Sequence, residues 1–254
     1  MLSLRKELTA RIRRAVTAAQ NDRLWSADLQ PSSFEVISAP HSAGGDVSWP
    51  GLLALPIGRE ARPRLAELLR TYMQITPACF YSWAGLQAGF VNFSWSEAGW
   101  EHLLRRAAAR EMPDGTVTIW QGQESLKAIG AVSHSQAREL TYAIQRTLWL
   151  EKMACDQRGQ ECIASSTDEV WAASLTSPEE RSILRLTEYL PWTCAKTAQT
   201  NRPQAAMAQA VRLARAWGEY YERFKLLKGT EAQIRARIAL GKAVRAALSP
   251  LALA

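Results

Sequence analysis

The second half of the chain, from about residue 133 onward, carries the periodicity of helices throughout. Apolar residues recur there three or four positions apart, as they do on the buried face of an amphipathic helix. Leu140, Ile144, Leu148 and Met153, which are four, four and five positions apart, suggest one such helix. Another helix is expected to begin at Pro178, because proline followed by two glutamates suits a first helical turn. We therefore predict an all-helical domain at residues 133–254.

Two further helices are expected towards the C-terminus. The helix after Pro203 has an apolar stripe of Met207, Val211, Ala214, Tyr221 and Phe224. This stripe favours a packed position for Tyr221 and a surface position for Tyr220, which lies off it. The last helix runs from about Glu231 to Leu248. Opposite its apolar residues it carries a basic set, namely Arg235, Arg237, Lys242 and Arg245.

The first half of the chain mixes helix and strand signals, which indicates an α+β domain with a small, mainly antiparallel sheet. Its basic N-terminus could be a transit peptide, but apolar residues at every fourth position favour an amphipathic helix. Strands are expected at residues 33–40, 80–85 and 89–95, and the stretch 49–57 is compatible with a helix. A helix is expected to start near Pro63, and Ser96 is expected to cap another that runs to about Arg110. We place this domain at residues 1–110, and a linker or last strand at residues 111–132.

The positive charge of the chain is unevenly distributed. The net charge is +7, and residues 201–254 alone contain ten Lys and Arg against three Asp and Glu, so the whole excess is located there. Charge concentrated on one element indicates a nucleic-acid partner. The alternative is the solvated face of a helical bundle.

Several segments, taken in order, resemble arginyl-tRNA synthetases. In the first half these are Gly45-Asp46, ARPRLAELL from Ala61 and GFVNF from Gly89. In the second half they are YAIQR (residues 142–146), WGEYYERFKLL (217–227) and RIALGKAV (237–244). The first group resembles the N-terminal domain of that family, and the second resembles its DALR-type anticodon-binding helical bundle. The catalytic domain that separates these parts in the family has no room here. The resemblance thus implies a noncatalytic, synthetase-like protein.

The resemblance also implies which residues contact RNA. In the anticodon-binding bundle the transferable candidates are Tyr142, Arg146, Tyr220 and Tyr221, joined by the basic set Arg235, Arg237, Lys242 and Arg245. In the N-terminal domain the corresponding region, expected near the D-loop side of tRNA, contains Asn92, Ser96 and Trp100. Tyrosine rings stack on exposed bases and guanidinium groups hold phosphates, which suits this role. For each residue the alternative is a structural one: a packed tyrosine, a surface arginine, or a hydrogen-bonding asparagine.

Signals for catalysis, metals and cofactors are sparse. The synthetase HIGH and KMSKS signatures are absent from the sequence, as are phosphate-binding glycine loops and the GxSxG nucleophile motif. The three histidines and four cysteines are scattered, so we expect no metal, no cofactor and no enzymatic activity. No apolar run is long enough to cross a membrane, and the pattern of cysteines suits a reducing cytoplasm.

The leading hypothesis is therefore a tRNA-binding protein, for arginine tRNA, that serves as an RNA-presenting subunit of a modification enzyme or other complex. The alternatives are a protein-interaction or assembly subunit that re-employs the synthetase scaffold, and one half of a split synthetase.

Overall fold

The computed structural model describes residues 4–39, 44–76, 78–108, 133–158, 172–200 and 203–252. It divides into two compact units, Met1–Trp100 and Glu101–Ala254. The division falls within helix α3, Glu97–Ala108. The predicted linker at residues 111–132 lies outside the described residues.

The N-terminal unit combines two helices with one small sheet. Helix α1, Leu4–Asn21, buries Leu4, Leu8, Ile12 and Val16, which confirms the predicted amphipathic helix. Helix α2, Ala61–Met73, has Pro63 in its first turn and packs against α1. Strands β1 (Ile37–Ser38), β2 (Val47–Trp49), β3 (Tyr81–Gln87) and β4 (Phe90–Trp95) follow the order β1-β2-β4-β3. Every neighbouring pair is antiparallel, as the fold class predicted.

The β3–β4 hairpin is the best-formed part of this sheet. Its loop is the two residues Ala88 and Gly89, whose φ angles are +52° and +84°. Two positive φ values in a two-residue loop match the right-handed twist of the flanking strands. Both predicted strands at residues 80–95 are therefore confirmed. Ser96 follows as the helix cap, because its Oγ accepts a hydrogen bond of 3.1 Å from the N–H of Gly99.

Two expectations for the N-terminal unit are corrected. The strand expected at residues 33–40 is reduced to Ile37–Ser38. The stretch 49–57 forms no helix: Trp49 ends strand β2, and turns follow it. Pro50 and Pro56 explain this result, because proline lacks the N–H that a continuous helix requires.

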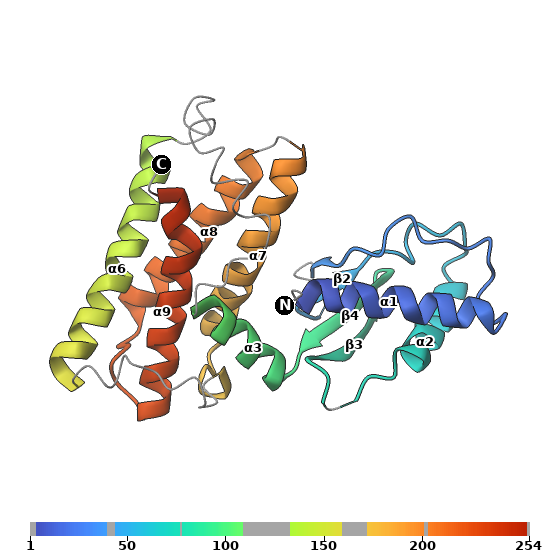
Figure 1. Ribbon diagram of the computed structural model, residues 1–254, viewed down its shortest axis with the longest axis horizontal. Coiled ribbons are helices and arrows are strands. Elements are labelled where there is room, and N and C mark those ends of the chain that lie inside the picture. Colours follow the sequence, from blue (N-terminus) through green and yellow to red (C-terminus); the bar gives the residue numbers. More distant parts are fainter. Residues whose placement is uncertain are drawn as a thin grey trace. The chain divides into compact units, whose positions relative to one another are not determined.

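The C-terminal unit is a bundle of long helices (Figure 1). These are α6 (His134–Arg158), α7 (Pro178–Thr200), α8 (Pro203–Arg223) and α9 (Glu231–Ala252), with a short 3₁₀ turn η2 at Ala172–Ser174. Helices α8 and α9 each pack against both α6 and α7, and also against each other. Trp217 of α8 is fully buried, and Gly241 of α9 lies beside its ring. The all-helical C-terminal half is thus confirmed.

The start of each helix reflects a local sequence signal. Ser177 and Glu180 form a reciprocal capping box at α7, with hydrogen bonds of 3.0 and 3.1 Å. Thr230 and Gln233 do the same at α9, with bonds of 3.0 and 3.3 Å. Helix α7 continues through Pro191, although proline inside a helix removes one backbone hydrogen bond. These caps fix where α7 and α9 begin.

Candidate nucleic-acid interface

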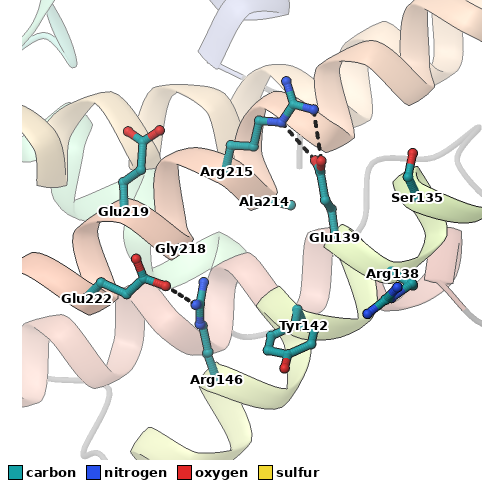
Figure 2. A pocket seen from close by; sticks show the side chains of 10 residues that line it. All are labelled: Ser135, Arg138, Glu139, Tyr142, Arg146, Ala214, Arg215, Gly218, Glu219 and Glu222. Carbon is teal, nitrogen blue, oxygen red and sulfur yellow. Dashed lines mark hydrogen bonds and ion pairs between the residues drawn. The ribbon is translucent and has the colours of Figure 1, made fainter.

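A groove runs between α6 and α8 on the surface of the C-terminal unit. It has a volume of about 490 Å³. Helix α6 contributes Ser135, Arg138, Glu139, Tyr142 and Arg146, and helix α8 contributes Ala214, Arg215, Gly218, Glu219 and Glu222 (Figure 2). Positions 135, 138, 142 and 146 are three or four apart and hence share one face of α6. The groove therefore presents three arginines, three glutamates and one tyrosine to solvent.

Arg146 is the central cation of this groove. Its guanidinium carbon lies 5.6 Å from the ring centroid of Tyr142 and 5.8 Å from that of Tyr221. Its Nη2 donates to the carboxylate of Glu222 on α8. Both distances are within the range in which a cation is attracted to an aromatic face. Arg146 is thus held between two tyrosines, while 26% of its side chain remains exposed.

Gly218 makes this position of Arg146 possible. A Cβ atom added at Gly218 would lie 2.5 Å from Nη1 of Arg146. That distance is shorter than any normal contact, so a larger residue would displace the guanidinium. The glycine in WGEYYERFKLL therefore has a role in the groove that the sequence alone did not reveal.

A second ion pair bridges the groove. Nε and Nη2 of Arg215 donate to the two carboxylate oxygens of Glu139, both at 2.8 Å (Figure 2). These hydrogen bonds lower the pKa of Glu139 below its ordinary value and raise that of Arg215. The paired, two-bond geometry links α6 to α8 and fixes the far end of the groove.

Tyr142 has the exposure that a base-stacking residue requires. It is 57% exposed, and Trp149 on the same helix is 64% exposed. The two are seven positions apart and therefore share a face of α6 with Arg146. Sequence reasoning named Tyr142 and Arg146 but missed Trp149, Arg138, Arg215 and Gly218. Arg138 and Trp149 could have been found from their helical spacing to Tyr142 and Arg146 of YAIQR. Gly218 lies within WGEYYERFKLL, and Arg215 precedes that segment by two residues.

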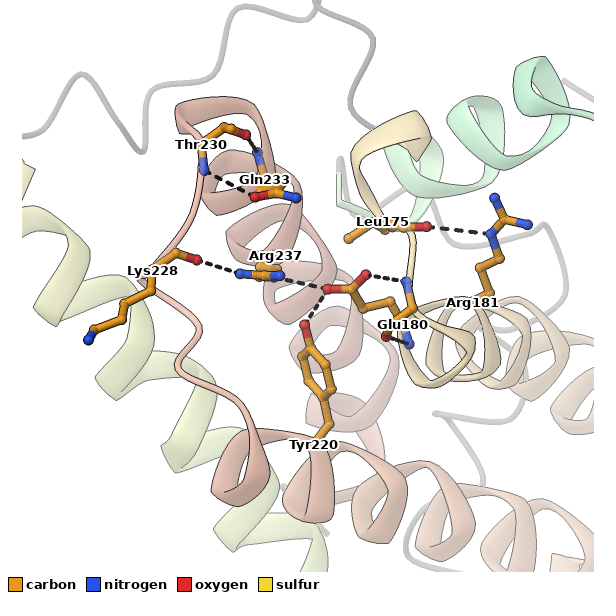
Figure 3. Close-up of polar contacts among 9 residues, drawn as sticks. Leu175, Glu180, Arg181, Tyr220, Lys228, Thr230, Gln233 and Arg237 are labelled. Carbon is orange, nitrogen blue, oxygen red and sulfur yellow. Dashed lines mark hydrogen bonds and ion pairs between the residues drawn. The ribbon is translucent and has the colours of Figure 1, made fainter.

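The expected surface position of Tyr220 is wrong. Tyr220 is only 2% exposed, and its hydroxyl donates a 2.5 Å hydrogen bond to Glu180, which is itself 1% exposed (Figure 3). Burial, followed by the bond to Glu180, raises the pKa of Tyr220. Helix α8 packs against α6, α7 and α9, so residues off its predicted stripe are also covered. Tyr221 is the half-buried member of the pair and the one beside Arg146.

Arg237 also belongs to the interior network rather than to a basic surface. Its Nε donates to Glu180 at 2.9 Å, and its Nη1 donates to the carbonyl of Lys228 at 2.7 Å (Figure 3). Burial would lower the pKa of Arg237, but its interactions with Glu180 and Tyr220 outweigh burial and raise it. Glu180 therefore ties together α7, α8 and α9.

The other members of the basic set on α9 are half-buried. Arg235 pairs with Glu231 at 3.0 Å, and Arg245 pairs with Glu151 of α6 at 3.1 Å. Lys242 is half-buried. The predicted basic face of the last helix is thus largely engaged within the bundle.

The three RNA-contact candidates in the N-terminal unit are buried or half-buried and serve the fold of that unit. Asn92 of β4 is 1% exposed and accepts a 2.5 Å hydrogen bond from Ser48 of β2. Trp100 is 6% exposed, and Ser96 is half-buried as the cap of α3. The side chains of Asn92 and Trp100 are therefore not accessible to a ligand in this conformation.

Metal-binding clusters and membrane-spanning helices are both absent from the part of the chain that is described. Within it, no group of three or more His, Cys, Asp or Glu residues could hold a metal ion. No helix among the same residues is long and apolar enough to cross a membrane.

Comparison with known proteins gave one positive result. Neither the curated proteins nor the solved structures yielded a match. Residues 140–252, just under half of the chain, match the family model described as the DALR anticodon binding domain. The matched region begins within α6 and ends with α9, so it includes the α8 side of the groove and, on α6, Tyr142 and Arg146. The C-terminal part of this chain is therefore similar to the DALR anticodon-binding domain of aminoacyl-tRNA synthetases.

Proposed function

We propose that this protein binds tRNA through the groove between α6 and α8 and does so without catalysing aminoacylation. The similarity to an anticodon-binding domain suggests tRNA binding in general. The observation that carries the proposal is Arg146, held at the surface between Tyr142 and Tyr221. A solvent-exposed ring beside a guanidinium group can stack an unpaired base and hold its phosphate. Loop nucleotides of tRNA offer both features.

Substitutions in the groove test this proposal directly. Tyr142→Ala and Arg146→Ala should each raise the Kd for tRNA about tenfold, since stacking on one side chain contributes about 1–3 kcal/mol. Arg70→Ala is the matched control for Arg146→Ala. Arg70 is an exposed arginine on α2, and its loss changes the net charge by the same amount. Filter binding at moderate salt measures all three variants. Equal losses in the three variants, or no retention of tRNA by the unaltered protein, would refute the proposal.

The absence of catalysis is proposed from the sequence. The HIGH and KMSKS signatures that position ATP in class I synthetases are missing from the 254 residues. Arginine-dependent exchange of pyrophosphate into ATP measures the first half-reaction of a synthetase. We expect none above background, and exchange that is lost on denaturation would contradict this part of the proposal.

The preference for arginine tRNA follows from the resemblance to arginyl-tRNA synthetases. Sequencing of the RNA retained by the protein from a total tRNA pool would show enrichment of arginine isoacceptors. An unbiased pool would leave general tRNA binding intact but remove this specificity.

We extend the proposal to a partner role, in which the bound tRNA is presented to another protein such as a modification enzyme. Such a partner would give tRNA binding without catalysis a function. A stoichiometric protein should therefore remain with the chain on purification in the presence of nuclease. A chain that purifies without any partner both with and without bound tRNA would contradict the presenting role.

A further inference from the structure

A second hollow lies between α6 and the segment that follows α8. It has a volume of about 370 Å³. Its lining is mainly apolar and consists of Leu150, Met153, Gln157, Tyr221, Phe224, Lys225, Leu226, Leu227 and Lys228. We refer to these nine residues as the apolar groove. It lies within the C-terminal unit. Of the residues that contact Arg146, namely Tyr142, Tyr221 and Glu222, it includes only Tyr221.

Exposed apolar side chains extend this surface along α6. Met153 is 38% exposed, and Trp149, one helical turn before it, is 64% exposed. Residues four apart are neighbours on a helix surface, so Trp149 adjoins the rim of the apolar groove. Contiguous exposed apolar surface of this kind marks sites of interaction.

The floor of the apolar groove is held in place by interior contacts. Leu226 is 5% exposed, and Leu227 packs against the buried cluster of Ala154, Ile234 and Ile238. The carbonyl of Lys228 accepts the 2.7 Å hydrogen bond from Arg237 (Figure 3). The N–H of Lys228 donates a 2.9 Å hydrogen bond to the carbonyl of Lys225. A segment fixed in this way is already ordered before a ligand arrives, which lowers the entropic cost of binding.

The rim of the apolar groove is basic on the side of α8. Lys225 and Lys228 line it, and both are exposed. On α6 the exposed residues next to Met153 include Lys152 and, one turn later, Asp156, which balance each other. The two lysines after α8 therefore give the rim a net positive charge and favour an acidic ligand.

We propose that the apolar groove binds an acidic amphipathic segment of a partner protein. Leucine, methionine and phenylalanine form a lining that accepts aliphatic and aromatic anchors three or four positions apart on a helix. Methionine in particular adapts to such anchors. The glutamates or aspartates of the same segment would meet Lys225 and Lys228. This inference rests on the partner role proposed above, but it does not require RNA binding.

Two other occupants fit the groove less well. An RNA base stacks on a flat exposed ring, whereas four of the lining side chains are aliphatic leucine or methionine. A second copy of this chain in a two-fold dimer would bring the same lysine-bearing patch against itself. Like charges facing each other oppose that arrangement.

A designed peptide pair tests the inference on the full chain. The first peptide is a fluorescein-labelled amphipathic helix with leucines three and four positions apart and glutamate on its other faces. The second replaces every glutamate by lysine. Fluorescence anisotropy should give saturable binding of the glutamate peptide and binding about tenfold weaker for the lysine peptide.

Three variants locate the binding. K225E/K228E should weaken the glutamate peptide about tenfold and improve the lysine peptide, because the charge of the rim is reversed. M153E should weaken both peptides, since it places a charge on the apolar lining. R70A, which removes an exposed arginine of α2 in the N-terminal unit, should leave the affinity for either peptide unchanged. All four altered positions are at least partly exposed, so the variants are expected to fold, and circular dichroism checks this.

The opposite results overturn the inference. It fails if the glutamate peptide shows no saturable binding, or if neither K225E/K228E nor M153E changes its affinity. It also fails if light scattering shows a dimer that M153E dissociates, which would identify a second copy as the occupant. Loss of tRNA retention in K225E/K228E and M153E without any peptide binding would assign the groove to RNA. Because tRNA binding is measured with Y142A and R146A, failure of the peptide test and failure of the tRNA proposal remain separate.

Discussion

At Gly218 the absence of a side chain leaves room for the guanidinium of Arg146. Gly218→Ala should push Arg146 away from its place between Tyr142 and Tyr221 while keeping every charge of the protein. We expect the Kd for tRNA to rise about tenfold, close to the effect of R146A. Stability should not fall, because alanine is favoured over glycine inside a helix by about 0.5–1 kcal/mol. Filter binding and urea denaturation measure the two quantities.

Gly241→Ala is the matched control for this prediction. Gly241 also lies inside a helix, but a Cβ atom there would lie 3.4 Å from the ring of Trp217, which is an ordinary contact distance. The free energy of unfolding should rise by a similar amount, with no change in tRNA binding. If both alanine variants bind tRNA as tightly as the unaltered protein, the position of Arg146 is not important for binding.

The thiols of Cys79 and Cys194 differ sharply in their surroundings. Burial raises the pKa of Cys194 to about 12. Burial also acts on Cys79, but hydrogen bonds from Thr76 and the positive charge of Arg11, whose Nη1 lies 3.1 Å from the sulfur, outweigh it and lower the pKa. Because the thiolate is the reactive form, iodoacetamide should alkylate Cys79 much faster than Cys194 near neutral pH.

The pH dependence of this alkylation shows whether the pKa of Cys79 is lowered or raised. The rate at Cys79 should rise with pH and level off at a lower pH than that of an ordinary thiol, whose pKa is about 8.5. Arg11→Ala should shift that curve to higher pH, since it removes the nearby positive charge. Peptide mass spectrometry resolves the two cysteines. A curve that does not move in Arg11→Ala would exclude Arg11 as a cause of the lowered pKa.

At the scale of the helices, Glu180 is the point where α7, α8 and α9 are joined. It caps α7 and accepts hydrogen bonds from Tyr220 and Arg237. Arg237→Met would leave this buried carboxylate without its cation. The loss in free energy of unfolding should be about 2–3 kcal/mol, below the ~3–5 kcal/mol of a fully buried pair because Arg237 is partly exposed. Urea denaturation measures this change.

Arg223→Met serves as its control. Arg223 of α8 also pairs with a glutamate at the start of α7, Glu179 at 3.5 Å, but its side chain is 75% exposed. Solvent screens such a pair, so the expected loss is below about 1 kcal/mol. Equal losses in the two variants would show that the buried position of Glu180 adds nothing.

Helix α6 shows where prediction from the sequence reached its limit. The sequence predicted its existence and its approximate position correctly. The apolar series that indicated this helix, Leu140, Ile144, Leu148 and Met153, is not its buried face, because Leu148 is 46% exposed and Met153 is 38% exposed. The residues that are buried are Leu140, Ala143, Thr147, Leu150 and Ala154. Steps that alternate between three and four residues stay on one face, whereas repeated steps of four drift around the helix.

Contacts between distant parts of the sequence also explain why the groove could be predicted only in part. Tyr142 and Arg146 could be named from YAIQR, but their partner Glu222 and the space at Gly218 come from α8, more than seventy positions later. A single stripe on α8 could not show that three other helices would cover it, which is why Tyr220 was placed at the surface. Local signals such as the cap at Ser96 and the first-turn Pro63 were interpreted correctly, since each depends only on adjacent residues.

Over the whole molecule, the net charge of +7 overstates the cations available to RNA. Among the ten basic residues of positions 201–254, five form ion pairs with glutamates within the described structure, namely Arg215, Arg223, Arg235, Arg237 and Arg245. Of the three arginines that line the groove, Arg146 and Arg215 are paired with Glu222 and Glu139, so RNA phosphates would have to replace these carboxylates as partners. Local geometry, rather than total charge, should therefore set how strongly tRNA binding depends on salt.

This leads to a quantitative expectation for the full chain. Each phosphate contact to a single strand contributes about −0.7 to the slope of log K against log salt, so about three contacts give a slope near −2. Between about 50 and 200 mM salt the affinity for tRNA should then fall roughly sixteenfold. Anisotropy titrations at several salt concentrations measure the slope, and R146A should make it shallower by about 0.7. A slope steeper than about −5 would require many more phosphate contacts than the groove offers, and would place most of the RNA outside it.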